Sequence, residues 1–330
     1  MRRAPRTAAG LAPGLLLGLV LAACGGVAEP PADPAPDARP ERSQPAEELT
    51  VPDVPDDLEE QAERAAMSDL AALAEQKAAE LPPGLRAPVE GGDISWPQCP
   101  RGQGIPERRT LGLPMPLDSA RFVVMGLTNG PAFFPNPCLA DQVAWVRERG
   151  LLAGAYAVAS YPDAETLEEL GGRGPYPTDD PDDPYAAQRN VGYQQALFNI
   201  TTMRDAGLPA PLIWIDVEPV RDWEWTDDLA ANAAVVEGLR NGLVEKGYRI
   251  GIYSTAYLWS QAVGDLTLGD VPEWRAAGPT SRAEALRRCG ASYVVQGGSA
   301  AIGQWVEDDR DLNVTCPGTD TEAPTWFHAF

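Results

Sequence analysis

From Gly91 to the end of the chain, short apolar runs alternate with stretches of helix-forming residues, and this alternation is the strongest constraint on the fold. The apolar runs predict strands at 92–96, 121–127, 152–160, 211–218, 249–254, 291–296 and 302–307, with a weaker candidate at 272–277. Helices are predicted at 138–150, 186–207 and 226–247, and each of these segments ends at a glycine suited to a helix C-terminus.

Strands that alternate with helices over about 240 residues form a parallel sheet. This length suits a closed, TIM-like β/α barrel, with room for irregular last strands. An open, doubly wound sheet is the alternative, but it needs a glycine-rich turn after its first strand. The sequence there reads DISWPQCP, so we predict an α/β barrel domain over 91–330.

Residues 161–185 interrupt the alternation with a segment rich in proline and aspartate. A calcium-binding loop is conceivable, but the spacing of its acids matches no EF-hand pattern. We therefore expect a solvated surface loop.

The strand at 211–218 reads PLIWIDVE and carries two carboxylates, Asp216 and Glu218, at its C-terminal end. Residues two apart in a strand share a face, so both acids lie on the side of Trp214. In β/α barrels this end of the strands carries the active site. Two close carboxylates raise one pKa and place a proton donor beside an anion, as glycoside hydrolysis requires. Alternatively, both acids cap a helix or pair with arginines.

Further polar residues lie at the ends of other predicted strands. Asp93 lies near the end of the first strand, Tyr253 closes the fifth, and Asp311 comes just after the last, preceded by Gln304 and Trp305. In a barrel these positions converge at one mouth, although they are far apart in the sequence.

Five short motifs along the chain resemble the glycoside hydrolase family 25 lysozymes, N-acetylmuramidases with a modified β/α barrel. They are DIS at 93–95, DVE at 216–218, GIYS at 251–254, QW at 304–305 and DLN at 311–313. The resemblance covers about residues 91–316. It implies that Glu218 is the general acid and that Asp216 stabilises the transition state or assists the acetamido group of the substrate. Asp93 and Asp311 would complete the acidic cluster.

Two segments depart from the family pattern. The third strand has Ala157 where a histidine is common, and residues 126–130 read GLTNG where the family often has K-A-(S/T)-E-G. These changes predict a site wall that lacks one positive and one negative group.

Several side chains near the strand ends are candidates for sugar binding, because aromatic rings stack on sugar faces and amides form hydrogen bonds with hydroxyl groups. They are Trp96, Trp223, Tyr253, Gln304 and Trp305. For each tryptophan, burial in the core is the alternative.

These features predict a cell-envelope hydrolase of peptidoglycan or a related N-acetylated polysaccharide. One alternative is a catalytically inactive, glycan-binding or scaffold lipoprotein on the same barrel. A second is a chitinase-like family 18 enzyme, which normally has further acids before its D-x-E pair. Here those positions hold isoleucine and tryptophan.

The N-terminus has the pattern of an export signal. Arg2, Arg3 and Arg6 precede an apolar stretch at 11–23, and the sequence then reads LAAC. We predict a lipoprotein signal peptide over 1–23, lipidation of Cys24, and an exported protein anchored to the outer face of the cell membrane. An ordinary signal peptide with an incidental cysteine is the alternative.

Two segments separate the signal from the barrel domain. Residues 24–57 are rich in proline, alanine and acidic residues, and this composition predicts a disordered tether. Residues 58–83 contain strong helix formers that end at two prolines, which predicts a helical spacer. This helix could instead pack on the domain.

Four cysteines remain when Cys24 is set aside, an even number that indicates two disulfides in an exported protein. Three pairings are possible. We favour Cys99 with Cys138 and Cys289 with Cys316, because each pair joins neighbours in sequence order.

Composition excludes several classes of function. A net charge of −22 lacks the basic footprint of nucleic-acid binding. The single histidine, His328, argues against a Ser-His-Asp triad and a multi-histidine zinc site. We expect a monomer without metal or cofactor, whose partners are a cell-wall glycan and the membrane.

Overall fold

A computed structural model describes residues 88–219 and 225–330. The predicted signal peptide, Cys24, the tether at 24–57 and the spacer at 58–83 lie outside the described residues, as does Trp223. None of the described helices is long and apolar enough to cross a membrane.

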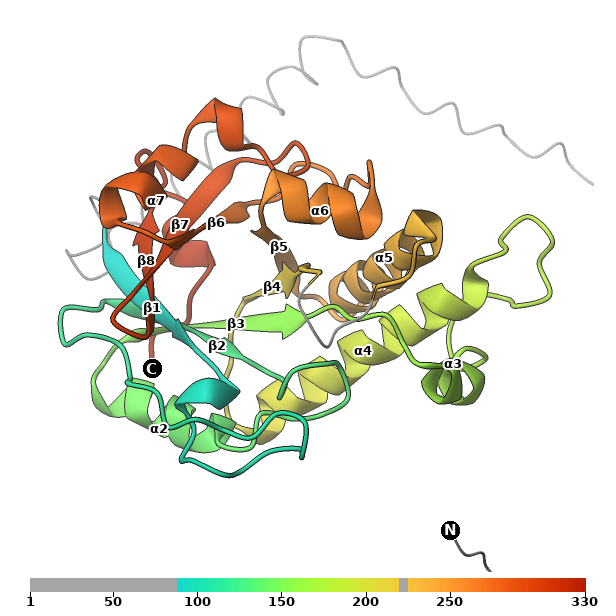
Figure 1. Ribbon diagram of the computed structural model, residues 1–330, viewed down its shortest axis with the longest axis horizontal. Coiled ribbons are helices and arrows are strands. Elements are labelled where there is room, and N and C mark those ends of the chain that lie inside the picture. Colours follow the sequence, from blue (N-terminus) through green and yellow to red (C-terminus); the bar gives the residue numbers. More distant parts are fainter. Residues whose placement is uncertain (1–87, 220–224) are drawn as a thin grey trace, which may run out of the picture. The chain divides into compact units, whose positions relative to one another are not determined.

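The described residues form a closed barrel of eight strands, which confirms the predicted α/β barrel (Figure 1). In barrel order the strands are β1 Glu90–Ile94, β2 Phe122–Gly126, β3 Leu152–Val158, β4 Leu212–Asp216, β5 Arg249–Ser254, β6 Glu273–Pro279, β7 Ala300–Glu307 and β8 Arg310–Thr315. The seven strands from β1 to β7 run parallel, and β8 is antiparallel to both of its neighbours.

Helices cover the outside of the barrel. They are α2 Leu139–Glu148, α3 Ala164–Leu170, α4 Ala186–Asp205, α5 Leu229–Glu245, α6 Ala256–Val263 and α7 Arg282–Arg288. The three predicted helices correspond to α2, α4 and α5, and each is followed by a glycine with positive φ. Four helices begin at a side-chain cap: Asp163 for α3, Asp228 for α5, Thr255 for α6 and Ser281 for α7.

The antiparallel strand β8 follows from a two-residue turn. Asp308 and Asp309 connect β7 to β8 with φ values of 50° and 57°, and Glu307 pairs with Arg310 across them. A turn this short joins only antiparallel strands, whereas a parallel neighbour needs a long crossover. Residues 310–315 were expected to follow the last strand, but they are themselves the last strand.

The strand predicted at 291–296 was wrong, and the weaker candidate at 272–277 is β6. Residues Ala291–Tyr293 form a short 3-10 helix, η3. The following backbone N–H groups of Val295, Gln296 and Gly298 donate to the buried carboxylate of Glu273, at 2.8–3.0 Å. A side chain thus accepts the hydrogen bonds that a neighbouring strand would otherwise accept.

The segment expected to be a solvated loop, 161–185, also differs in part. It contains α3, whose first turn is capped by Asp163 through a 2.7 Å bond from the backbone N–H of Thr166. The rest of the segment, 171–185, is mostly exposed, as expected.

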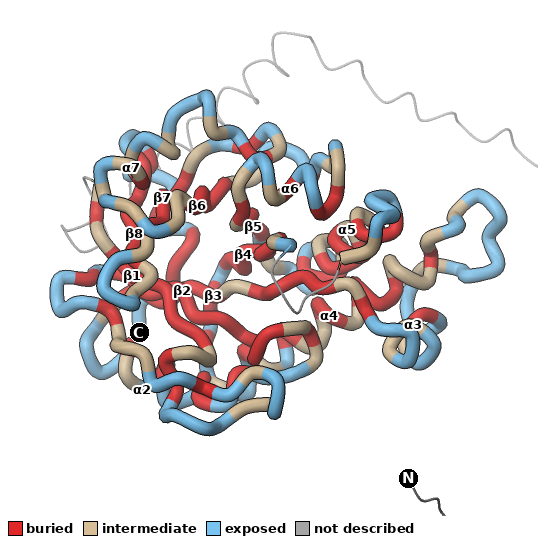
Figure 2. Tube along the Cα trace, in the orientation of Figure 1, coloured by how far each residue is buried: buried red, intermediate tan, exposed pale blue. Residues whose placement is uncertain are grey.

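The strands place alternate side chains in two layers. The outer layer packs against the helices and includes Ile213 and Ile215 of β4. The inner layer lies in the barrel and includes Trp214 of the same strand. Figure 2 shows the strands mostly buried, with most exposed positions in the connecting loops and on the helices.

The inner layer is aromatic toward the N-terminal ends of the strands. Trp214 lies 5.9 Å from both Trp274 and Trp326, and Phe122 lies 4.7 Å from Phe327, between ring centroids. The C-terminal segment supplies Trp326 and Phe327 and is held by paired backbone bonds between Ala153 and His328. This end of the barrel is therefore closed.

Glycine in β5 makes room for the largest inner side chain. Gly251 pairs with Trp214 across β4 and β5, and a Cβ at 251 would overlap the indole ring. The packing of the Trp214 ring therefore requires glycine at this position of the GIYS motif.

The structure contains both disulfides that sequence order favoured. Cys99–Cys138 and Cys289–Cys316 each have a Cα–Cα distance of 5.6 Å. The first joins the exit of β1 to the start of α2, and the second joins the end of α7 to the end of β8.

Candidate active site

The four predicted acids meet at the C-terminal mouth of the barrel. Asp93 is the fourth residue of β1, Asp216 ends β4, Glu218 follows two residues later, and Asp311 is the second residue of β8. Because β8 runs antiparallel, its start lies beside the end of β1, and the Cα atoms of Asp93 and Asp311 are partners. A single cavity of about 200 Å³ has all four acids in its wall.

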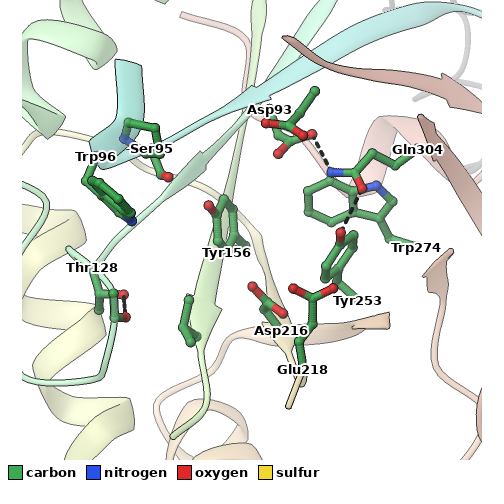
Figure 3. Close-up of a pocket in the computed structure, with 14 residues that line it drawn as sticks. Asp93, Ser95, Trp96, Thr128, Tyr156, Asp216, Glu218, Tyr253, Trp274 and Gln304 are labelled. Carbon is green, nitrogen blue, oxygen red and sulfur yellow. Dashed lines mark hydrogen bonds between the residues drawn. The ribbon is translucent and has the colours of Figure 1, made fainter. Parts of the chain in front are cut away.

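The cavity combines acids with aromatic and small polar side chains (Figure 3). Besides the acids, its lining consists of Ser95, Trp96, Pro97, Thr128, Gly130, Tyr156, Val158, Tyr253, Trp274 and Gln304. Three of the predicted sugar-binding residues, Trp96, Tyr253 and Gln304, are therefore in the wall.

The prediction for Trp305 was wrong. Its neighbour Gln304 faces into the barrel, so Trp305 faces outward and packs with Ala285, Leu312 and Val314. Its side chain is 4% exposed and belongs to the core between β7, β8 and α7. The alternation of side chains along a strand explains why only one residue of the QW motif reaches the site.

A chain of hydrogen bonds holds Asp93. The amide nitrogens of Gln304 and Asn313 both donate to Oδ2 of Asp93, at 2.9 and 2.6 Å. The Tyr253 hydroxyl donates to Oε1 of Gln304 at 2.7 Å, and the Trp274 indole donates to Oδ1 of Asn313 at 2.7 Å. Each amide therefore accepts from an aromatic donor and donates to the carboxylate, which fixes its orientation.

Asp216 and Glu218 extend from the end of β4 toward the same space, with Tyr253 beside Glu218 (Figure 3). Asp216 is 6% exposed, and its Oδ1 atom has no hydrogen-bond partner among the described residues. The indole of Trp225 donates to the backbone carbonyl of Glu218 at 2.9 Å. This bond fixes the backbone from which the Glu218 side chain extends.

Burial raises the pKa of every acid in the cluster. Burial and the neighbouring Asp311 raise the pKa of Asp93 well above its ordinary value, although its two amide bonds oppose the rise. Burial, Glu218 and Asp93 likewise raise the pKa of Asp216 well above the usual range.

The two acids nearest to solvent shift less. Burial raises the pKa of Glu218 to about 7, the nearby Tyr253 hydroxyl opposes the rise, and the charge of Asp311 adds to it. Burial raises the pKa of Asp311 to about 6. Four carboxyls this close cannot all be ionised near neutral pH, so the cluster holds protons that it can give up.

Sequence reasoning missed two aromatic residues of the wall, Tyr156 and Trp274. Tyr156 lies in β3 opposite Trp214, and burial together with the charges of Asp93 and Asp216 raises the pKa of its phenol well above the ordinary value. The alternation of side chains along β3, which turns Tyr156 inward, was the signal that could have identified it. Trp274 belongs to a strand that was only weakly predicted.

The two segments that depart from the family pattern lie differently with respect to the cavity: Thr128 and Gly130 of residues 126–130 line it, and its lining contains no arginine or lysine. Ala157 faces the outer layer, so its side chain does not line the cavity. Asn129 is buried and braces a loop, because its Oδ1 accepts from the backbone N–H of Ile105 at 2.8 Å. Gly126 leaves space for the ring of Tyr156, which would lie 2.6 Å from a Cβ at this position.

Among residues 88–219 and 225–330, no group of three or more histidine, cysteine or acidic side chains has the arrangement to hold a metal ion. The side chains that line the cavity supply carboxyl, phenol, hydroxyl, indole and amide groups.

Comparisons with known proteins agree with the motifs. The family model described as "Lysozyme-like protein 1" matches residues 183–284, a stretch that contains Asp216, Glu218 and Tyr253. A curated relative, "Probable GH family 25 lysozyme 4" of Dictyostelium discoideum, is 38% identical over 66 residues. The match covers 20% of this chain and 30% of the relative.

Solved structures with a similar chain path include two family 25 proteins. The glycosyl hydrolase 25 GHIP of Streptococcus pneumoniae shares 15% identity over 78% of this chain and 98% of that chain, with a TM-score of 0.45. The family GH25 lysozyme of Aspergillus fumigatus shares 14% identity over 72% of this chain and 99% of that chain, with a TM-score of 0.43.

The similarity to family 25 rests on the closed barrel, on the converging motif residues and on the two partial sequence matches. In its motifs and in these two partial sequence matches, the barrel domain of this chain is similar to the glycoside hydrolase family 25 lysozymes.

Proposed function

We propose that the protein is a cell-envelope glycan hydrolase that cleaves a glycosidic bond in peptidoglycan or a related N-acetylated polysaccharide. The observation that carries this proposal is the pairing of Asp216 and Glu218 in one cavity, with the pKa of Glu218 raised to about 7. The lysozyme names of the matched family model and relative support the substrate class.

Glu218 acts as the general acid in this proposal. With a pKa of about 7, a large share of its carboxyl groups is protonated near neutral pH, whereas an ordinary glutamate would be ionised. As the C–O bond to the leaving sugar breaks, the proton of Glu218 moves to the leaving oxygen. A water then adds to the sugar cation and returns a proton to the Glu218 carboxylate.

Asp216 stabilises the positive charge that develops on the sugar ring. Its Oδ1 atom lacks a protein partner, so it is free to accept a hydrogen bond from a donor on the substrate. The N–H of an acetamido group is such a donor. A donor at this position favours the ionised form of Asp216, so substrate binding lowers a pKa that burial has raised.

Asp93 and Asp311 influence the pKa values of the reacting pair, Asp216 and Glu218. Asp311 raises the pKa of Glu218, and Asp93 raises the pKa of Asp216. The hydrogen bonds from Gln304 and Asn313 keep Asp93 in place. These two acids therefore set the protonation of the reacting pair.

The inactive, glycan-binding alternative has less support. Acids in a silent scaffold are expected to be neutralised by cations, but no cation is among the influences on these four pKa values within the described residues. The carboxyls instead line an open cavity with raised pKa values, as expected for proton transfer.

The proposal is tested by the release of reducing ends from purified peptidoglycan. We expect Glu218→Gln to lower the rate by about 10²–10⁴-fold, because the general acid is lost. The matched control Glu168→Gln removes an exposed carboxyl from α3 and should keep the full rate. Equal activity of the wild type and Glu218→Gln would contradict the proposal. Absence of turnover in a folded wild type would favour the binding protein.

We also propose that lipid on Cys24 anchors the protein to the outer face of the cell membrane. The support is the LAAC sequence after an apolar run with three arginines before it. A radioactive acyl label should appear on the wild-type protein and be absent from Cys24→Ser. An unlabelled mature chain that begins at another residue would refute this anchor.

A further inference from the structure

A second, larger cavity continues from the acid cluster. It has a volume of about 540 Å³ and shares Glu218, Tyr253, Gln304 and Asp311 with the first cavity. Beyond these four, its wall comes from the segments around α6, β6, α7 and η3, on the β5–β7 side of the barrel (Figure 1). The acids thus lie at the junction of two cavities.

The two cavities differ in charge. The lining of the first has four acids and no cation, whereas that of the second includes Arg275 and Arg288. Arg275 is not available to a ligand, because it is 3% exposed and bonded to Glu273 and to backbone carbonyls. Arg288 is the cation that a ligand in this cavity can reach.

Arg288 lines the second cavity and is partly exposed. Its side chain is 28% exposed, and its carbon Cζ lies 4.5 Å from the centre of the Tyr293 ring. Nε forms an ion pair with Glu284 at 3.0 Å, without the angle of a hydrogen bond. The two terminal nitrogens have no hydrogen bond or ion pair to another described residue.

The backbone of Arg288 is held on both sides. Arg275 donates to the carbonyl oxygens of Arg288 and Gly290 at 3.0 and 2.9 Å, and the disulfide Cys289–Cys316 lies between them. Such preorganisation reduces the loss of conformational entropy on binding.

Two aromatic side chains in the same wall suit a sugar. Tyr257 of α6 is 69% exposed although it is large and aromatic, and Tyr293 is half-buried beneath Arg288. Aromatic faces stack on sugar rings, and a guanidinium group binds a carboxylate through two parallel hydrogen bonds. A neutral glycan forms no ion pair with Arg288. An anionic glycan is repelled by the acid cluster, and an ion pair with Arg288 offsets this repulsion.

We infer that this second cavity binds the carboxylate-bearing sugar of the glycan, through Arg288, next to the bond that is cleaved. The inference deepens the proposed function and rests on it for the class of polymer. It makes Arg288 a specificity residue that selects acid-substituted N-acetylated glycans over neutral ones.

The test measures binding of soluble peptidoglycan fragments to the full chain carrying Glu218→Gln, so that no turnover occurs. One set of fragments keeps its carboxyl groups, and a second has them converted to amides. We expect about fivefold to tenfold tighter binding of the carboxylated set, and loss of this preference in Arg288→Gln. Arg288→Lys should keep part of the preference, because the charge remains.

Arg287→Gln is the matched control. Arg287 is on the same helix, pairs with the same Glu284 and is 72% exposed, but it does not line the cavity. Its loss should leave the preference unchanged. Equal weakening of both fragment sets by Arg288→Gln, or an equal effect of Arg287→Gln, would overturn the inference. Tighter binding of fragments that carry phosphate would overturn the assignment to a carboxylate.

A cleavage assay with the wild-type chain, in which Glu218 is intact, distinguishes failure of this inference from failure of the proposed function. Cleavage of carboxylated and amidated glycan with equal kcat/KM would keep the hydrolase and reject the subsite. Carboxylate preference in binding without any cleavage would keep the subsite and reject the hydrolase. Thermal unfolding of each variant ensures that only folded protein is compared.

Discussion

The two ends of the barrel interior differ sharply, although the same strands build both. In β4, Trp214 and Asp216 are two residues apart and face the same way. Trp214 lies in a closed aromatic cluster, and Asp216 lies in an open acidic cavity. One end of the interior gains stability by burying apolar surface, whereas the other buries carboxyls at a cost in stability, as expected for the proposed proton transfer.

This difference means that stability and chemistry are separable by position. Substitutions in the aromatic cluster should act on the free energy of unfolding. Substitutions among the acids should act on the rate, with little loss or even a gain in stability.

The largest effect is expected for Trp214→Ala. The indole is fully buried between Trp274 and Trp326, and its loss leaves a cavity that the rigid barrel cannot close. We expect the free energy of unfolding to fall by about 3–5 kcal/mol, measured by denaturant titration. Trp145→Ala in α2, where the tryptophan is only partly buried against the core, is the control and should cost less. If both variants lost a similar free energy of unfolding, the aromatic cluster would contribute no more to stability than another tryptophan site.

Asp216→Asn tests the acidic end of the same strand. The change keeps the shape but removes the carboxylate, so the rate on peptidoglycan should fall by about 10²–10³-fold. Because burial and like charges raise the pKa of Asp216, the neutral amide should leave stability unchanged or increase it by about 1 kcal/mol near pH 7.5. Asp205→Asn on α4 removes an exposed carboxyl and should change neither quantity. A large loss of stability in Asp216→Asn would show that this acid is structural.

The pH dependence of stability should show the smallest effect. The pKa values of Glu218 and Asp311 are raised to about 7 and about 6 in the folded state, so the folded state binds more protons than the unfolded chain. The resulting stability is fully present below the ordinary carboxyl pKa and is lost as pH rises through about 6 and 7. We expect the free energy of unfolding to fall by about 1–3 kcal/mol between about pH 5 and pH 8.

The double variant Asp216→Asn with Glu218→Gln provides the check. It removes two carboxyls from the cluster, so its stability should vary less over the same pH range. If the free energy of unfolding of the wild type rose from pH 5 to pH 8, the change would have the opposite sign to the one expected from raised carboxyl pKa values.

Much of the fold was predictable because strand and helix patterns are local. The runs around β4 and β5 and the helix-ending glycines at 150, 207 and 247 carry their structure in neighbouring residues. The segment 291–296 was mispredicted because its backbone donors bond to Glu273, a residue that propensity does not link to them. The direction of β8 depends on a two-residue turn that was not recognised.

The acids of the site were predictable for a similar reason. Asp93, Asp216 and Glu218 lie near the C-terminal ends of parallel strands, which meet at one mouth of a barrel. Trp305 was misplaced because its side depends on the register of β7, and Trp274 was missed because its strand was weakly predicted.

The sequence by itself determined the strands β1 to β5, the helices α2, α4 and α5, the paired acids at the end of β4 and the cysteines in neighbouring pairs, since each depends on residues close in the chain. Only the tertiary structure decided which side chains share a cavity and which pKa values are raised. Asp93 and Asp311 meet across 218 residues of sequence, and Arg288 reaches the second cavity beside Tyr293. Desolvation and Coulomb interactions depend on distance in space, so they follow from the closed barrel and not from local sequence.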